Sequence, residues 1–597
     1  MTAVLDPLAE QTPRITLTRS HAVAVDAPVY DPQQLARQYQ GKWGILLRRV
    51  IEVIWPFVHL LLWVHWDRWR GIEQQRRPLH ARRLREILTE LGPAFIKIGQ
   101  ALSTRPDLLS PLFLEEMTKL QDELPPFDNA LAFQIIEEEL GLPPAQIYRE
   151  IGESPIAAAS LGQVYQGYLH NGKKVAIKVQ RPDLIEQISL DMYLVRQGMA
   201  WLKKRFKLRS DLVGIVDEFA GKLYEEMNYI QEGKNAETFA KLYQNSSIYV
   251  PKIYWEYTSR RILTMEWIDG IKLTHLDKIK AAGLDGRHLI EIGVNCSLKQ
   301  LLEHGFFHAD PHPGNLLAMP DGRLAYIDFG MMSTLEVRHR YGLLKAIVHL
   351  VNRDFPALAQ DYVDLGFLTP ETDLTPIIPA LAEVFAEAMG APVAELNFKS
   401  ITDKLSGVMY EYPFRVPAYY ALIIRSLLTL EGIAIGIDPS FKVLSVAYPY
   451  VATRILTDPA PELREALREL LFDRGQFRWT RLENLLRNAS HSQDFKLEQS
   501  LEKAADFLLS QRGAFIRQYL AESVLSGSGA GETLTHLQRL WEILSQNPAF
   551  QPLNLLPLAM KLVAHPQLLE FTQELAQRWL QRSAARWIRQ VFLPPEG

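Results

Sequence analysis

The feature that most constrains this chain is a polar loop followed at a fixed distance by a second acidic motif. Residues 308–315 read His-Ala-Asp-Pro-His-Pro-Gly-Asn, and an Asp-Phe-Gly triplet at 328–330 begins eighteen residues after Asp310. The order H-x-D-x-x-x-x-N and D-F-G is typical of phosphotransfer sites, where one carboxylate lies beside the accepting hydroxyl and an amide and a second carboxylate bind Mg²⁺. The spacing predicts Asp310 in the first role and Asn315 and Asp328 as metal ligands.

A lysine upstream of these motifs lies where such a site needs a positive charge. Residues 164–179 alternate apolar and polar side chains around an Asn-Gly turn signal, which predicts a β-hairpin. Lys178 ends the V-A-I-K run on the second strand, from which it can reach phosphates and a carboxylate on the next helix. Glu232, in the following helical run, is the candidate partner. Taken alone, V-A-I-K also fits an edge-strand lysine that faces water.

The segment before the hairpin has the frame of a phosphate-covering loop but lacks two of its glycines. In a G-x-G-x-x-G-x-V loop, backbone N–H groups approach phosphate oxygens closely because glycine has no side chain. Here alanine occupies the first two glycine positions, and an Ala-Ser-Gly stretch is also common in ordinary turns. The residues assigned to nucleotide binding in this loop are Ala157, Ala158, Ala159, Ser160, Leu161, Gly162, Gln163 and Val164.

A different interpretation of the polar loop is a metal cluster, because His308, Asp310 and His312 fall within five residues. A Pro-Gly-rich loop without a spaced fourth ligand is a poor structural zinc site, however. Each motif taken alone has an ordinary explanation. Since loop, lysine, helix glutamate, H-x-D-x-x-x-x-N and D-F-G occur in this order, a kinase-like site is the better interpretation.

Composition excludes several other classes of protein. The 597 residues carry 65 basic and 69 acidic side chains, a formal charge of −4, and 47% are hydrophobic. That content supports large cores and excludes disorder, collagen and coiled coil as overall classes. Near-neutrality argues against bulk nucleic-acid binding, and a single cysteine, Cys296, excludes an internal disulfide framework and a cysteine-rich metal site.

The patterns along the chain predict an α+β, protein-kinase-like fold with two lobes and helical regions at both ends. We expect helices over 83–150, a long helical stretch over 183–244, strands near 250–254 and 261–267, a flexible linker at 526–531 and an amphipathic segment at 571–592. The expected division is a mobile N-terminal arm at 1–40, a helical extension at 41–150, an N-lobe at 151–270, a C-lobe at 271–450 and a helical C-terminal region at 451–597.

An apolar run at 50–66 precedes a strongly basic segment at 67–86. The apolar run holds a glutamate, a proline and two histidines and is shorter than the roughly 20 residues of a bilayer-spanning helix, so we expect no span. Tryptophan beside arginine suits a lipid headgroup boundary, but a buried helix whose arginines lie on its solvent-exposed face fits the pattern equally well. The basic segment contains Arg68, Arg70, Arg76, Arg77, Arg82, Arg83 and Arg85.

Taken together, these motifs resemble the UbiB family, the AarF-domain-containing atypical kinases linked to isoprenoid quinone lipids. The resemblance covers roughly residues 84–436 and includes the K-x-G-Q signature at 97–100, the following ALSTRPDLLSP and the alanine-rich loop. By spacing alone Lys97 would be a solvated lysine on an amphipathic helix. The resemblance instead implies that the helices carrying Lys97 and Gln100 lie across the cleft where a protein kinase receives its peptide, which disfavours protein substrates.

The resemblance also assigns roles to single residues. It implies that Lys97 contacts an acidic motif at Glu226, that Lys178 pairs with Glu232, that residues 157–164 determine nucleotide preference and that Glu266 lies at the adenine-contacting hinge between the lobes.

The chain departs from the family at its E-x-D motif. That motif reads Glu226-Met227-Asn228 here, so one possible charge or metal contact is missing. In addition, no A-P-E motif follows Asp328, so the usual platform for a peptide substrate is not visible.

These observations predict an atypical kinase or ATPase of the UbiB type that acts at membranes in isoprenoid quinone or prenyl-lipid biosynthesis or its regulation. The expected cofactors are ATP or ADP and Mg²⁺, and the expected partners are a nucleotide and a membrane surface with a lipid or quinone precursor, without nucleic acid. We expect a cytoplasmic, peripherally membrane-associated protein. The alternatives are an ATP-gated, non-catalytic scaffold at the membrane and a Ser/Thr protein kinase. The predicted catalytic residues are Asp310, Lys178, Glu232 and Lys97.

Overall fold

The computed structural model divides the chain into two compact units. The first comprises residues 1–292, 306–333 and 418–429, and the second comprises 293–305, 334–417 and 430–597. The structure describes residues 29–103, 109–120, 125–206, 212–309, 313–351, 353–386, 398–438, 441, 443–457, 460–473, 476–489 and 530–545, with 517, 573 and 577. Asp310, His312 and most of the predicted segments at 526–531 and 571–592 lie outside the described residues.

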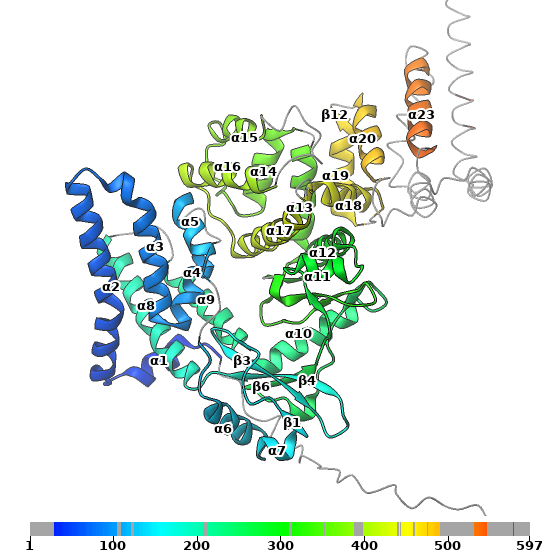
Figure 1. Cartoon of the computed structure of the whole chain (residues 1–597). Helices are drawn as coiled ribbons and strands as arrows, with labels where there is room; N and C mark the ends of the chain where they lie inside the picture. Colours follow the sequence, from blue (N-terminus) through cyan, green and yellow to red (C-terminus); the bar gives the residue numbers. More distant parts are fainter. Residues whose placement is uncertain are drawn as a thin grey trace, which may run out of the picture. The chain divides into compact units, whose positions relative to one another are not determined.

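The first unit begins with helices whose ends follow from local sequence (Figure 1). Gly92 separates α3 from α4 with a φ of +102°, a conformation that favours glycine, and Gly141 ends α6 at a φ of +79°. The Gly-Pro and Gly-Leu-Pro sequences at 92–93 and 141–143 predict breaks at these two positions. The helices are α1 (Pro32–Tyr39), α2 (Trp43–Trp69), α3 (Glu73–Leu91), α4 (Pro93–Leu102), α5 (Pro111–Thr118), α6 (Asn129–Leu140) and α7 (Pro144–Ile147).

Residues 32–39, placed by the sequence in a mobile arm, form helix α1. Asp31 caps the helix by accepting the N–H of Gln33 at 2.8 Å. Leu35 and Tyr39, one turn apart, are buried, and the Tyr39 hydroxyl donates to the Glu186 carbonyl at 3.2 Å. For this part of the arm the expectation was wrong, because an eight-residue helix with two buried positions is too short to show a periodic pattern.

A five-stranded antiparallel sheet carries the predicted hairpin. Its order is β1-β3-β4-β6, with β2 paired to β3, and Val164 on β3 lies opposite Lys178 on β4. Gly172, at a φ of +79°, turns the chain between β3 and β4, so the hairpin prediction is confirmed. The strands are β1 (Glu150–Ile151), β2 (Ala157–Ala158), β3 (Gly162–Tyr168), β4 (Lys174–Gln180) and β6 (Ile262–Glu266).

The long helical stretch expected over 183–244 is confirmed, and it is divided into three helices, α8 (Leu184–Phe206), α9 (Leu212–Glu226) and α10 (Tyr229–Leu242). A second, four-stranded sheet follows with the order β5-β10-β9-β7, and β11 pairs with β8. The strand expected at 250–254 lies earlier, as β5, and only a single bridge joins Ile253 to Met265. These strands are β5 (Ile248–Tyr249), β7 (Ile271–Lys272), β8 (Phe306–His308), β9 (Leu316–Ala318), β10 (Leu324–Tyr326) and β11 (Met332–Thr334).

The described part of the chain after β11 is predominantly helical, as its sequence predicts. Among the described residues, no helix combines the length and apolar content that crossing a bilayer requires. The remaining α-helices and strands are α11 (Leu276–Ala281), α12 (Gly286–Lys299), α13 (Val337–Val351), α14 (Phe355–Asp364), α15 (Ile377–Ala386), α16 (Phe398–Glu411), α17 (Ala418–Ile437), α18 (Val443–Thr457), α19 (Pro461–Leu471), β12 (Phe472–Asp473), β13 (Gln476–Phe477), α20 (Trp479–Ala489) and α23 (Ala530–Ser545).

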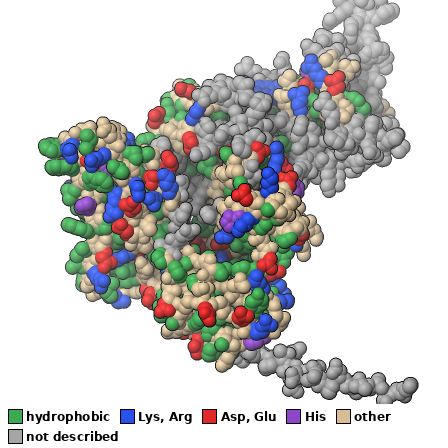
Figure 2. All heavy atoms as spheres, in the orientation of Figure 1, with side chains coloured by type: hydrophobic (Ala, Val, Ile, Leu, Met, Phe, Trp, Pro, Cys, Tyr) green, Lys and Arg blue, Asp and Glu red, His purple; other side chains and the backbone are tan. Residues whose placement is uncertain are grey.

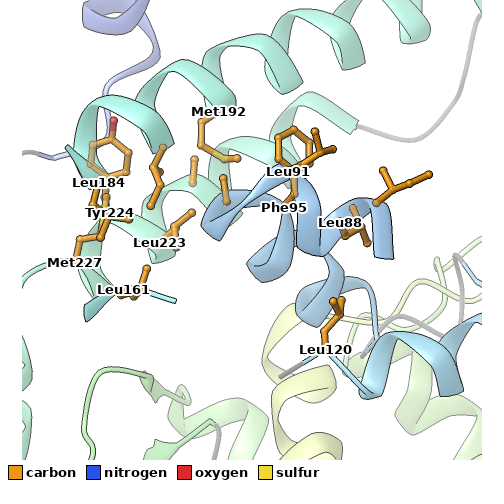
Figure 3. Packing of buried hydrophobic residues seen from close by; sticks show 14 of the residues in the cluster. Leu88, Leu91, Phe95, Leu120, Leu161, Leu184, Met192, Leu223, Tyr224 and Met227 are labelled. Carbon is orange, nitrogen blue, oxygen red and sulfur yellow. The ribbon is translucent and has the colours of Figure 1, made fainter. Parts of the chain in front are cut away.

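One hydrophobic core joins the N-terminal helices to α8, α9 and the alanine-rich loop. Phe95 of α4, Leu184 of α8 and Leu223 of α9 belong to it, and so does Leu161 from the alanine-rich loop (Figure 3). Burying these side chains is the main favourable term in holding such helices together. The N-terminal extension therefore packs as part of the first unit.

Two buried polar contacts fix the inner side of α2. Arg49 forms two hydrogen bonds to the Asp191 carboxylate, of 2.7 and 2.9 Å, and donates to the Leu91 carbonyl at 2.8 Å. Near the other end of the helix, Asp67 and His80 are buried against each other at 2.9 Å. Such contacts are costly to break because each leaves a buried polar or charged group without its partner. The inner face of α2 is thereby anchored to α3 and α8.

Candidate functional site

Lys178 lies between two carboxylates that come from distant parts of the sequence. Its Nζ contacts Oε1 of Glu232 on α10 and lies 3.4 Å from Oδ2 of Asp328. The Lys178 and Glu232 side chains are 13% and 4% exposed, whereas that of Asp328 is 37% exposed. The site therefore presents one carboxylate to solvent beside a buried ammonium group.

Backbone hydrogen bonds hold the D-F-G segment in place. The Gly330 N–H donates to Oδ1 of Asp328 at 3.0 Å, and the Phe329 N–H donates to Oε1 of Glu232 at 3.4 Å. On the other side, Nε2 of His308 lies 2.8 Å from the Asp328 carbonyl oxygen, to which it can only donate, and Asn235 donates to the Phe329 carbonyl at 3.0 Å. These contacts fix the carboxylate of Asp328 in one orientation.

Burial and charge act in opposite directions on the three ionisable groups. Burial raises the pKa of Glu232 to about 7, although the ammonium of Lys178 works against it. Burial would also raise the pKa of Asp328, but Lys178 and the Gly330 N–H outweigh it and lower that pKa to about 2. Burial lowers the pKa of Lys178, yet Asp328 and Glu232 reverse the sign and leave it raised. At neutral pH Lys178 is therefore a cation and Asp328 an anion.

Lys97, from the K-x-G-Q segment on α4, reaches the same region. Its Nζ lies 2.6 Å from Oε1 of Glu226, the last residue of α9, and the Lys97 side chain is only 6% exposed. Gln100, one turn later, donates to the Leu120 carbonyl at 3.3 Å. Both contacts implied by the resemblance, Lys97 with Glu226 and Lys178 with Glu232, are thus present.

Asn228, where the chain departs from the family motif, caps the helix that carries Glu232. It is the N-cap of α10, and its Oδ1 accepts the Ile230 N–H at 3.2 Å. An N-cap oxygen satisfies an otherwise unpaired helical donor, and asparagine serves as well as aspartate there. The substitution therefore keeps the capping contact while removing a negative charge.

The alanine-rich loop forms a tight turn between β2 and β3. The Ala159 N–H donates to the Gly162 carbonyl at 2.8 Å, and the side chains of Ser160, Leu161 and Gln163 are buried. A Cβ on Gly162 would come within 2.5 Å of both the Tyr229 hydroxyl and the Val179 carbonyl oxygen. The glycine is therefore required by close packing.

The structure places the remaining predicted residues at the ends of strands. The Asn315 carbonyl accepts the N–H of Ile327, the residue before Asp328, at 3.1 Å. Glu266 ends β6, and its carboxylate accepts the Tyr249 hydroxyl, at 3.0 and 2.9 Å, and the Lys252 N–H at 3.1 Å. These hydrogen bonds do not test the adenine contact of Glu266, which stays a prediction.

Sequence reasoning missed Tyr229, which is buried beside the charged cluster. Burial raises its pKa, with Glu232 adding to the effect and Lys178 opposing it. Asp310, predicted to lie beside the acceptor, is outside the described residues, so its role remains a prediction. In the part of the chain that the structure describes, no three His, Cys, Asp or Glu side chains gather as a metal-binding group.

Comparison with known families accounts for most of the chain. A model of the ABC1 atypical kinase-like domain matches residues 119–362, and the UbiB helical domain matches 381–442. An uncharacterized protein of Synechocystis sp. (strain ATCC 27184 / PCC 6803 / Kazusa) is 52% identical over 652 residues, covering 100% of this chain and 96% of the relative. The chain belongs to the ABC1/UbiB family of atypical kinases. The kinase-like α+β fold predicted from the sequence is confirmed.

The C-terminal region also finds a counterpart within the ABC1/UbiB family. Residues 481–595 match the C-terminal domain of ABC1 kinase 3. Protein ACTIVITY OF BC1 COMPLEX KINASE 3, chloroplastic, of Arabidopsis thaliana is 44% identical over 613 residues, covering 95% of this chain and 86% of the relative. The helices after residue 450, to which the sequence assigned no role, thus include a domain that recurs in this family.

The arrangement has the donors that Mg²⁺ and phosphates require in an ABC1/UbiB kinase-like site. Mg²⁺ is usually held by one or two protein oxygens together with phosphate oxygens and water. An ionised, partly exposed Asp328 fits that donor set, and the ammonium of Lys178 fits a phosphate. The backbone of Asn315 is hydrogen-bonded to Ile327, the residue before Asp328, which brings the two predicted metal ligands near each other in the chain fold. These residues could therefore hold a nucleotide with its metal.

The raised pKa of Glu232 predicts a pH-dependent stability in metal- and nucleotide-free buffer. The folded protein keeps the Glu232 proton up to about pH 7, whereas an unfolded glutamate releases it near 4.5. Because Glu232 then binds more protons in the folded state, its contribution to the free energy of unfolding falls as the pH rises between these values. Glu232→Gln removes this loss, so its stability relative to the native sequence should increase from pH 5 to 7 and level off above about pH 8.

Urea unfolding of both proteins between pH 5 and 8 measures this difference. Exposed Glu237→Gln, on the same helix, is the matched control and should run parallel to the native sequence. A Glu232→Gln curve that also stays parallel would show that the carboxylate is already ionised at pH 5.

Proposed function

We propose that the chain binds ATP or ADP with Mg²⁺ at Lys178, Glu232 and Asp328 and catalyses phosphoryl transfer or ATP hydrolysis. The observation that carries the proposal is the position of Lys178 between a buried carboxylate and a partly exposed one. In kinases the lysine–glutamate ion pair and the D-F-G aspartate must both be in place for catalysis. Membership of the ABC1/UbiB family supports the same assignment.

Each residue then has a separate task. Lys178 neutralises phosphate charge, and Glu232 holds its ammonium group against α10. Asp328 and Asn315 supply oxygens for Mg²⁺, which when bound neutralises the charge of the phosphates. Asp310 orients the acceptor hydroxyl or water and takes its proton. Catalysis of this kind consists largely of positioning and electrostatic stabilisation, so the fixed geometry of the D-F-G segment matters.

We further propose that the acceptor belongs to isoprenoid quinone or prenyl-lipid metabolism. The resemblance of the K-x-G-Q segment supports this assignment, because it implies that α4 excludes peptide substrates. The buried ion pair between Lys97 and Glu226, at 2.6 Å, supplies a contact that would hold α4 in such a position. The Arabidopsis thaliana relatives are themselves named as kinases.

Asp310→Asn tests the catalytic proposal. ATP hydrolysis with Mg²⁺, measured with and without anionic liposomes and a phenolic quinone-precursor mimic, should fall by about 10²-fold or more, because a general base contributes that much. Nucleotide binding should persist, since the amide is isosteric with the carboxylate. Asp321→Asn, in an exposed turn, is the control and should hydrolyse ATP normally.

Equal turnover in Asp310→Asn and the native protein would remove Asp310 from catalysis. Bound nucleotide without turnover in the native protein would instead favour the ATP-gated scaffold. The closed turn of the alanine-rich loop, in which the Ala159 N–H is already used, is the observation that keeps this second function in consideration.

The outer face of α2 supports a membrane contact for the same protein. Figure 2 shows hydrophobic side chains gathered with arginines along the edge of the molecule where α2 lies. Contiguous exposed apolar patches of this kind mark interaction surfaces, since isolated apolar residues are normal but long rows are not. The exposed large hydrophobic residues of α2 are Trp43, Ile45, Leu47, Ile51, Ile54, Trp55, Val58, Leu61, Leu62, Trp66 and Trp69.

The composition of this α2 face favours an anionic bilayer as the occupant. Tryptophan residues at both ends of the helix suit the headgroup boundary. Three nearby arginines, Arg48, Arg68 and Arg82, are 85%, 69% and 64% exposed, and each pairs with a glutamate, at 3.0, 2.7 and 3.1 Å. Because such exposed ion pairs are weak, these guanidinium groups can turn to lipid phosphates. Because Arg49 and Asp67 anchor the inner side of α2, the outer face can rest on a surface without the helix detaching. We therefore propose a peripheral membrane location.

Replacing Trp55 and Leu62 together by serine should weaken membrane binding. The two residues lie two turns apart, are 69% and 63% exposed, and each fully buried side chain of this size contributes about 1.5–3 kcal/mol. In sedimentation with anionic vesicles, the variant should lose at least about tenfold in partitioning. Trp201→Ser, an exposed tryptophan on α8, is the control. Equal partitioning of all three proteins would contradict the α2 contact.

A further inference from the structure

Gln163 ties the alanine-rich loop to residues 125–127, which precede α6 in the N-terminal extension. Its Oε1 accepts the Phe127 N–H at 3.0 Å, and its Nε2 donates to the Phe127 carbonyl at 3.3 Å. The side-chain amide of Gln163 thus binds both the N–H and the carbonyl of Phe127, as the backbone of a neighbouring strand would. Since Gln163 is only 1% exposed, these hydrogen bonds are shielded from water and costly to leave unmade.

Arg181, just after β4, makes a second tie between the same two segments. Its Nε donates to the Ala159 carbonyl at 3.0 Å, and its Nη2 donates to the Pro125 carbonyl at 2.8 Å. The guanidinium carbon also lies 5.6 Å from the centre of the Phe127 ring, within the range of a cation–π contact. One side chain thereby bridges the loop and residues 125–127.

The loop held in this way is closed upon itself. The Ala159 N–H donates to the Gly162 carbonyl, and the Arg181 N–H donates to the Leu161 carbonyl at 2.9 Å. Leu161 is buried in the core formed with α4, α8 and α9. A phosphate-covering loop works by pointing its N–H groups at phosphate oxygens, so the Ala159 N–H must leave Gly162 before it can serve a phosphate.

We propose that Gln163 and Arg181 form a clasp through which residues 125–127 hold the alanine-rich loop in its closed turn and thereby control nucleotide binding. This inference rests on the proposed function, because it concerns the same nucleotide site. Both residues act as positioning residues: they hold the loop and do not themselves touch the reacting atoms. The N-terminal extension then acts on the site at a second point, separate from Lys97.

The clasp makes nucleotide affinity depend on a loop equilibrium. When only an open loop can offer its N–H to phosphate, the apparent dissociation constant is the intrinsic one divided by the open fraction. Removing a tie raises that fraction. One lost hydrogen bond corresponds to about fivefold in the equilibrium and hence in affinity, as long as the closed state still predominates.

Two variants and one control separate the clasp from general packing. Gln163→Leu removes both hydrogen bonds to Phe127, and with them the one that Nε2 donates to the Tyr165 hydroxyl, with little change of volume. Arg181→Lys leaves the Tyr165 contact in place and keeps the charge, but it cannot reach two carbonyls as the guanidinium fork does. Gln166→Leu, three residues further along β3 and half-buried, is the matched control. Arg181→Lys keeps the test valid if Gln163→Leu fails to fold.

Amide hydrogen exchange of the nucleotide-free, full-length protein gives the first measurement. Both variants should exchange faster at Phe127 and across 157–162, whereas the β9–β10 pair and the Gln166→Leu protein should exchange as in the native chain. Titration with a slowly hydrolysed ATP analogue and Mg²⁺ gives the second measurement. Both variants should bind it about fivefold tighter or more, and Gln166→Leu should match the native protein.

Three outcomes would overturn the clasp: unchanged exchange at 127 and 157–162, an affinity equal to that of Gln166→Leu, or weaker binding in both variants. Failure of the proposed function gives a different result, because the native protein then binds no nucleotide at all. In that case the clasp cannot control nucleotide binding, even when faster exchange in the variants shows that it joins residues 125–127 to the alanine-rich loop.

Discussion

The interaction on which the first unit depends is the ion cluster of Lys178, Glu232 and Asp328. A buried ammonium group is tolerated only beside carboxylates, so strand β4, helix α10 and the D-F-G segment must meet at one point. The Asn228 cap fixes where α10 begins, and the N–H groups of Phe329 and Gly330 hold the two carboxylates. The same arrangement leaves Asp328 ionised and partly open to solvent, which is the state in which it can bind a metal.

The N-terminal extension contacts the elements of this site directly. Lys97 contacts Glu226 on α9, and Leu161 of the alanine-rich loop shares a core with Phe95. Through Gln163, the segment after α5 also holds the loop that would cover phosphates. A movement of the extension, for instance when the outer face of α2 binds a surface, would therefore displace the alanine-rich loop, because these contacts join the two segments.

Those parts of the site that depend on local pattern were predictable from the sequence. The β3–β4 hairpin follows from alternation around Asn171-Gly172, and helix breaks follow from Gly92 and Gly141. The order of Lys178, Glu232 and the D-F-G motif indicated a common site before any geometry was known.

Contacts made between distant segments were not predictable in the same way. Neither the clasp of Gln163 on Phe127 nor the packing of Tyr229 against Gly162 has a local signature, since each depends on how strands and helices meet. Helix α1 was missed because eight residues show too little periodicity. The helical stretch over 183–244 was predicted correctly, but its division into three helices was not, because the sequence keeps a helical character throughout. Asn228 was treated as a lost charge, whereas its capping oxygen is the part that the fold uses.

The most direct test of the central claim is the effect of Mg²⁺ on ADP binding, measured by calorimetry in the native protein, in Asp328→Asn and in the control Asp321→Asn. If Asp328 holds the metal beside Lys178, Mg²⁺ should strengthen ADP binding by about tenfold or more in the native and control proteins and have no effect in Asp328→Asn. ADP binding that is indifferent to Mg²⁺ in the native protein, or equally enhanced in Asp328→Asn, would contradict the account.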